Sequence, residues 1–100
     1  MATTSKVLFR GAATTTSSTL YTVPSLTTTV VTNILITNTA TSSATYDLLL
    51  DDVSIANDVI VAANDTTSID LKQVLPATDT IKGLASATTV NFHISGVEIA

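Results

Sequence analysis

The sequence predicts an all-β fold, a small antiparallel β-sandwich or barrel, from two observations. About eight short segments alternate apolar and polar residues with period two, and polar turns separate them every eight to twelve residues or so. No segment shows a sustained helical period, so the chain lacks the crossover helices that a parallel sheet requires. Antiparallel pairing is therefore the expected arrangement.

Composition places all of residues 1–100 in a single domain. A chain of this length can bury about two-thirds of its unfolded surface in one core. Hydrophobic residues make up 45% and charged residues only 12%, so the chain is too apolar to remain disordered despite its Ser/Thr tracts. The absence of cysteine excludes disulfide frameworks, zinc knuckles and thiol catalysis.

Charge and hydropathy limit the partners. Four basic residues against eight acidic ones give a net charge of -4, and no cluster of Lys or Arg suits a phosphate backbone, so we expect no nucleic-acid partner. No stretch approaches the ~20 apolar residues of a membrane helix, and the first residues lack the apolar run of a signal peptide. We expect synthesis in the cytoplasm and no membrane partner.

The segment Val30–Asn38 is the predicted central strand, because it is rich in β-branched residues and carries apolar side chains on both faces. Strand alternation places Val30, Thr32, Ile34 and Ile36 on one face. A polar stretch at 38–44 predicts a hairpin turn, with Thr45–Asp52 as its return arm. The residues predicted to form the core are Ile34, Ile36, Leu48, Leu50, Val90, Phe92 and Ile94.

Other strand-like segments complete the pattern. They are Lys6–Arg10, Thr19–Pro24, Val53–Asn57, Val59–Ala62, Thr66–Leu71, Asp79–Ala85 and Thr88–Ile99. Asn57 and Asp58 predict a turn, and one short helical turn is considered over Leu71–Leu75. Val97 and Ile99 are out of phase with Ile94 across Gly96, which predicts a β-bulge in the last strand.

Candidate chemical groups favour structural roles. Asp47, Asp51, Asp52 and Asp58 form the densest acidic group, but their spacing does not match a calcium loop, and the chain has too few aromatics for a glycosidase cleft. His93, the only histidine, is expected to point away from the core, without triad or metal partners. We therefore predict no catalytic, cofactor-binding or metal-binding residues. The triplet Asn64, Asp65 and Thr66 is interpreted as a turn rather than a glycosylation site.

Two stretches of the chain contain short recognisable motifs. The closing stretch VLPATDTIKGLASATTVNFHISGVEI has a hydrophobic-Pro-x-x-Asp-Thr-Ile loop at Leu75–Ile81, then a Gly-containing strand and a final Ser-Gly-Val-Glu-Ile. The earlier stretch Leu20–Ala40 has a Tyr-x-Val-Pro strand before the central strand. Together the two stretches resemble small bacteriophage virion proteins, the head decoration (cement) proteins and related tail modules, although Ser25–Thr27 replaces a glycine-containing turn of that family. The resemblance implies an immunoglobulin-like or jelly-roll-like sandwich, and synthesis in the cytoplasm of a host cell.

The resemblance also implies a function. It indicates a non-enzymatic protein at the capsid surface of the virion that binds the major capsid protein lattice and copies of itself, with a trimer as one option. The first alternative is an oligomeric tail or baseplate module. The second is a carbohydrate-binding β-sandwich, which the lack of aromatic platforms disfavours.

The N-terminal arm, residues 1–10, is the candidate partner-binding segment. Two of the four basic residues flank its apolar run: the segment consists of Lys6, Val7, Leu8, Phe9 and Arg10. Such a run at a terminus can add a strand to a neighbouring subunit's sheet, or can pair within its own sandwich. Both possibilities stay open at the level of the sequence.

Overall fold

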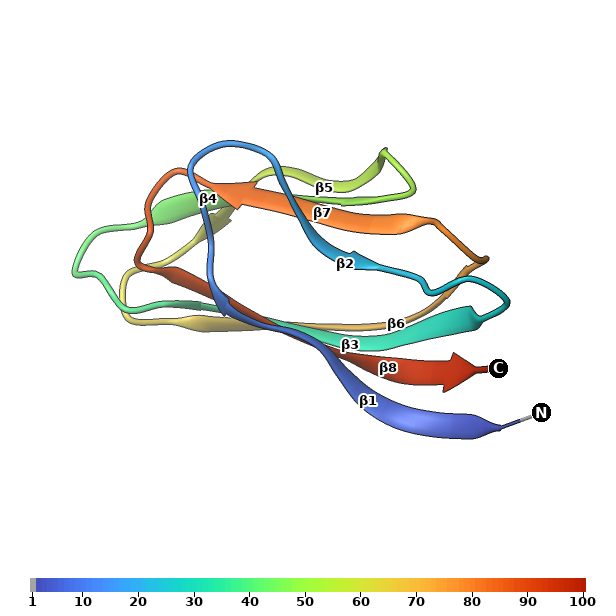
Figure 1. The fold of residues 1–100 in the computed structure, drawn as a ribbon. Coiled ribbons are helices and arrows are strands. Elements are labelled where there is room, and N and C mark those ends of the chain that lie inside the picture. Colours follow the sequence, from blue (N-terminus) through green and yellow to red (C-terminus); the bar gives the residue numbers. More distant parts are fainter. Residues whose placement is uncertain (1) are drawn as a thin grey trace.

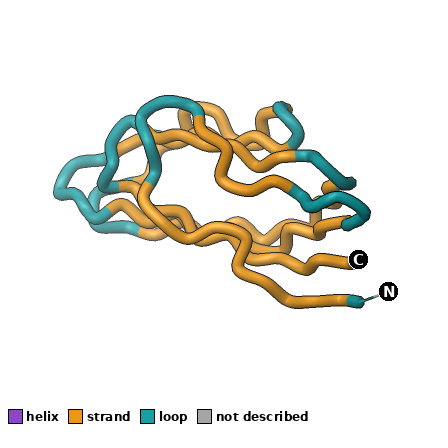
Figure 2. The backbone as a smooth tube through the Cα atoms, viewed as in Figure 1, coloured by secondary structure: helices purple, strands orange, loops and turns teal. Residues whose placement is uncertain are grey.

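A computed structural model describes residues 2–100, and within them all regular structure is β-strand (Figure 2). The strands are β1 (Thr3–Ala12), β2 (Ser18–Thr22), β3 (Thr28–Asn38), β4 (Ala44–Leu50), β5 (Val53–Val61), β6 (Thr66–Leu75), β7 (Thr80–Ala85) and β8 (Val90–Ile99). The described residues contain no helix with the length and hydropathy to span a membrane. The all-β prediction with about eight short strands is confirmed.

The strands form two stacked four-stranded antiparallel sheets, with orders β1-β8-β3-β6 and β2-β7-β4-β5 (Figure 1). Only β4 and β5 are consecutive in sequence and adjacent in one sheet. Every other connection carries the chain from one layer to the other, so the topology is a jelly roll, the second of the two sandwich types expected. The two chain ends lie together at one end of the sandwich (Figure 1).

The predicted hairpin at 38–44 is wrong, because this segment joins the two layers. Asn38 is fully buried at the end of β3 and organises the crossing. Its side-chain amide donates to the Ser42 carbonyl over 2.8 Å, and its carbonyl oxygen accepts from the Ala40 N–H over 3.0 Å. Apolar alternation shows which side of a strand faces the core, but it does not show which strands pair. The next strand in sequence has the same pattern whether it lies beside the first in one sheet or opposite it in the other sheet.

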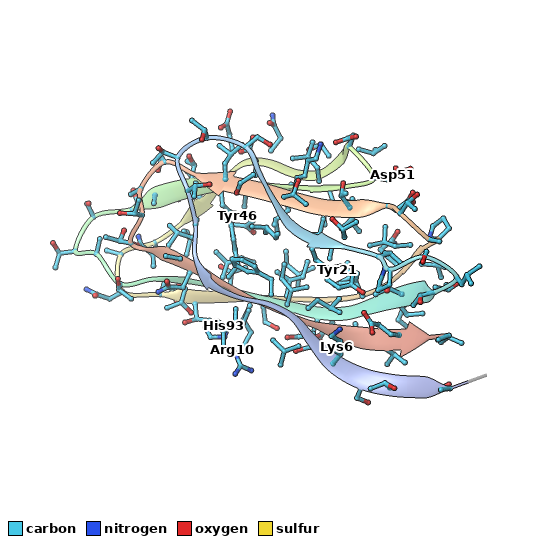
Figure 3. The ribbon with its side chains drawn as sticks, in the orientation of Figure 1. Lys6, Arg10, Tyr21, Tyr46, Asp51 and His93 are labelled. Atoms are coloured by element: carbon cyan, nitrogen blue, oxygen red, sulfur yellow. The ribbon has the colours of Figure 1, made fainter. Side chains whose placement is uncertain are left out.

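The core lies between the sheets, and all seven residues predicted to form it are buried there. Tyr46 of β4 and Phe92 of β8 meet edge to face across the sandwich, with ring centroids 6.3 Å apart and planes at 74°. This is the favoured arrangement for two aromatic rings. Figure 3 shows the Tyr46 side chain between the two layers, and side chains from both sheets fill the core.

Register breaks cross the sheet β1-β8-β3-β6 near Gly96, but β8 itself continues without a bulge. The extra residues are Leu8 in β1 and Thr32 in β3, where the pairing with β8 shifts by one. The sequence predicted a bulge in the last strand, and this prediction is wrong, because the bulges lie in β1 and β3. The bulge at Thr32 also reverses the facing of Val30, which lies on the opposite side from Ile34.

Three aspartates occupy left-handed backbone positions in the hairpin β4–β5. Asp51 and Asp52 have φ of 54° and 60°, which makes a two-residue turn of the type that joins twisted antiparallel strands. Asp58, with φ of 50°, lies at a register shift inside β5, so the predicted turn at Asn57 and Asp58 is a bulge in one continuous strand. Asp tolerates this left-handed conformation better than most residues.

Two further turn predictions have different outcomes. Ala63 and Asn64 do form the turn between β5 and β6, with Asn64 at φ of 54°. The helical turn considered over Leu71–Leu75 is wrong, because β6 extends to Leu75 and pairs with β3 as far as Thr29. The pairing of Val74 with Val30 supplies backbone partners that local sequence cannot show.

Candidate interaction surfaces

The predicted partner-binding arm lies in β1, at the outer edge of its sheet and paired with β8. Leu8 is buried and Phe9 packs against the core, so both belong to the domain's own packing. Val7 remains 45% exposed, and Arg10 points away from the sandwich (Figure 3). Of the five predicted residues, Val7 and Arg10 are the ones that remain exposed and uncommitted for contact with another chain. Partner binding by the arm itself stays a prediction.

Lys6 belongs to a polar cluster between the sheets that sequence reasoning missed. Its Nζ lies 3.3 Å from Glu98 Oε2, and the Tyr21 hydroxyl hydrogen-bonds both Glu98 and the Thr29 hydroxyl, the latter over 2.8 Å. Thr29 is fully buried and the Glu98 side chain is 15% exposed. The cluster therefore joins β1, β2, β3 and β8 near the end where the termini lie.

The unbroken alternation of β8 explains why a carboxylate lies there. Phe92, Ile94 and Gly96 face the core, so Glu98 faces the same side, and Val97 and Ile99 face outward. A partly buried carboxylate is stabilised by hydrogen bonds and an opposite charge, which Tyr21 and Lys6 provide. The hydrogen bond from Tyr21 and the charge of Lys6 lower the pKa of Glu98, whereas burial and Glu98 raise the pKa of Tyr21 to about 12.

Acidification is expected to destabilise the fold through Glu98. Because its pKa is lower in the folded chain than the ordinary 4.5, the stabilisation is complete above pH 4.5 or so and is lost as pH falls through the folded pKa. Glu98→Gln should lower the free energy of unfolding at pH 7 by about 1–3 kcal/mol and flatten its decline below pH 5 or so. Urea unfolding between pH 7 and 2 measures both effects. Asp70→Asn, which changes an exposed carboxylate, is the matched control, and an equal response of both variants would contradict the assignment.

The opposite edge of the sandwich, formed by β5 and β6, exposes apolar side chains. Val53 is 66% exposed and Ile60 69% on β5, and Val74 is 64% exposed on β6. Ile55 and Val59 of β5 are also exposed. Single exposed apolar residues are ordinary, but several along one edge are typical of a contact surface.

The acidic residues singled out in the sequence contact the backbone or a lysine side chain. Asp47 accepts the Asp58 N–H over 2.9 Å, and Asp52 pairs with Lys82 over 2.7 Å. Residues 2–100 hold no group of three or more His, Cys, Asp or Glu side chains that could bind a metal ion. His93 lies on the outer face of its sheet, as predicted, with Leu35 and Arg10 as its cross-strand partners (Figure 3).

Comparison with known proteins gives a likeness of fold. No family model matches the sequence, and no curated protein matches it. A structure of infectious bursal disease virus, Gx strain, superposes on 97% of the chain with a TM-score of 0.59 and 12% identity. The T13 viral particle of the same virus gives 0.57 and 9% over 97% of the chain. This chain spans 31% and 30% of those two chains, so it corresponds to about a third of each. A pentameric capsid protein from metagenomic phage sequences is a more distant neighbour, with a TM-score of 0.40, 17% identity, and coverage of 90% of this chain and 59% of that one.

Proposed function

We propose that this chain is a structural module of a virion that binds the outer surface of the major capsid protein lattice, and that it has no catalytic role. The observation that carries the proposal is the strand order, β1-β8-β3-β6 over β2-β7-β4-β5, which superposes along 97% of the chain on parts of a viral particle. The jelly roll is a recurrent solution for capsid domains.

The distribution of surfaces supports a binding role. The core side chains are used in packing, and the polar cluster of Lys6, Tyr21, Thr29 and Glu98 satisfies its own hydrogen bonds. The exposed apolar residues lie mainly along β5 and β6 and on the outer side of β1. Such edges suit modest contacts that are multiplied over many copies on a symmetric lattice.

Co-sedimentation tests the proposal. The purified chain is mixed with empty capsids, and separately with isolated tails, of the virus that encodes it, and each mixture is run on a sucrose gradient. We expect the chain in the capsid fractions at a fixed ratio to the major capsid protein. Its recovery with tails alone would favour the alternative of a tail or baseplate module, and its absence from both would refute a virion role.

A further inference from the structure

The sandwich has two open sides, one formed by β1 and β2 and the other by β5 and β6 (Figure 1). β1 and β6 are the edge strands of one sheet and have ten residues each. In residues 2–100, the outer edge of each strand has no partner strand. Unpaired backbone N–H and C=O groups on an edge can accept a strand from another chain.

The two open sides carry opposite charge. No Asp or Glu occurs before Asp47, so β1 and β2 carry only the cations Lys6 and Arg10. Lys6 is engaged by Glu98, whereas Arg10 makes no ion pair within residues 2–100. β5, β6 and the segment that joins them carry three acids and one cation, which are Asp58, Asp65, Asp70 and Lys72.

The outer face of the same sheet places matching side chains at its two edges. Arg10 and Val7 project outward from β1, and Asp70 and Val74 project outward from β6. Asp70 Oδ1 accepts from the Asn33 amide over 3.0 Å, which orients the carboxylate on that face. The β1 edge therefore presents one cation and one exposed valine on this face, and the β6 edge presents one carboxylate and one exposed valine with Lys72 between them. Asp70 is the group on β6 whose charge is opposite to that of Arg10.

We propose that copies of this chain associate head to tail, with β1 of one copy beside β6 of the next and Arg10 against Asp70 of the neighbouring copy. The occupant of each edge is thus a second copy of the chain. The inference rests on the proposed function, because a virion module acts in many copies, and it names the surfaces through which they meet.

Strand direction and register agree with this arrangement. Neighbouring strands alternate in direction across the sheet, so β1 of an identically oriented copy would run antiparallel to β6 and continue the sheet. Arg10 is in the same cross-strand row as His93, Leu35 and Ser68, one outward position from Asp70. Diagonal neighbours on one face lie about 7–8 Å apart at their Cα atoms, within reach of an arginine side chain.

The contact is heterologous, since two different edges meet, and successive copies build a ring or an open chain. This property separates it from a two-fold contact between identical edges. In a two-fold contact through β1, only changes in β1 matter, and a compensating change in β6 has no effect. Head-to-tail association requires both edges on every copy.

Sedimentation velocity over a range of concentrations, at low and high salt, tests the proposal. Arg10→Glu and Asp70→Lys should each weaken self-association by about tenfold or more, because each sets like charges against one another. The double variant, which exchanges the two charges, should return the dissociation constant to within about threefold of wild type. Salt should weaken the wild type and the double variant alike.

Charge-matched controls lie outside β1 and β6, the two strands that meet in the proposed contact. Lys82→Glu and Asp52→Lys reverse the exposed ion pair that joins β7 to the β4–β5 turn, and they should leave association unchanged. Circular dichroism melts check that every variant folds. Failure of the charge exchange to restore association, or a wild type that stays monomeric at millimolar concentration, would overturn the proposal. A monomer that binds capsids would leave the proposed function standing, whereas head-to-tail association without capsid binding would refute only that function.

Discussion

Replacing Gly96 with alanine is expected to cost about 3 kcal/mol or more of unfolding free energy, among the largest effects of any single methyl group in this chain. A Cβ at this position would lie 2.8 Å from Leu8 Cδ1 and closer still to the Val30 carbonyl oxygen. The leucine side chain can rotate away, but the carbonyl belongs to the backbone of β3. The strands must therefore separate, which weakens the pairing at the centre of the sheet.

Chemical denaturation of the purified variants measures the cost. Gly11→Ala is the matched control, because a Cβ there meets nothing closer than Phe9 at 3.4 Å, an ordinary contact. Adding Leu8→Ala to Gly96→Ala should not restore stability, since the clash with the Val30 carbonyl remains. Gly96→Ala with a midpoint equal to that of Gly11→Ala would show that β3 and β8 are not so closely packed.

Truncating Phe92 to alanine should cost about 3–5 kcal/mol, a large fraction of the stability of a small domain. Phe92 is fully buried and meets Tyr46 of the opposite sheet edge to face, so its loss leaves a cavity at the centre of the sandwich. The cost combines lost burial of the ring with the cavity that the two rigid sheets cannot close. Urea unfolding followed by far-UV circular dichroism gives the value.

The outward neighbour of Phe92 provides the comparison. His93→Ala changes a side chain on the outer face of the same strand and should alter stability by no more than ~0.5 kcal/mol. Equal melting temperatures for Phe92→Ala and wild type would mean that the facing of β8 is reversed. Tyr46→Phe keeps the aromatic ring that packs against Phe92, so it should lose much less stability than Phe92→Ala.

The predicted core was recovered in full because burial along a strand has period two. Phe92 and Ile94 alternate with polar His93, and Leu48 and Leu50 alternate with Asp47 and Leu49, so the inward faces follow from the sequence. The same rule failed for Val30 because Thr32 inserts one extra residue, and a bulge changes the phase without any marker in the composition.

The polar cluster could not be predicted because its members are far apart in the chain. Glu98 is 77 residues from Tyr21 and 92 from Lys6. The pairing of β1 with β8 brings Lys6 to Glu98, and the stacking of the two sheets brings Tyr21 to them. One signal was present: Gly96 in phase with Ile94 already placed Glu98 on the inward face. The apolar residues Val97 and Ile99, out of phase with Ile94, instead predicted a bulge.

The sequence by itself determined the fold class, the approximate strands and the inward faces, since all three depend on local periodicity and β-propensity. Tertiary structure decided which strands pair, which connections cross between layers and which groups meet at the two open edges. Two strands with equally apolar inward faces bury those faces whether they pair side by side in one sheet or pack face to face across the core. The local pattern therefore does not decide between the two arrangements. In this chain the choice was resolved by contacts such as those of Asn38 at the β3–β4 crossing and of Gly96 beside the Val30 carbonyl in the paired strand.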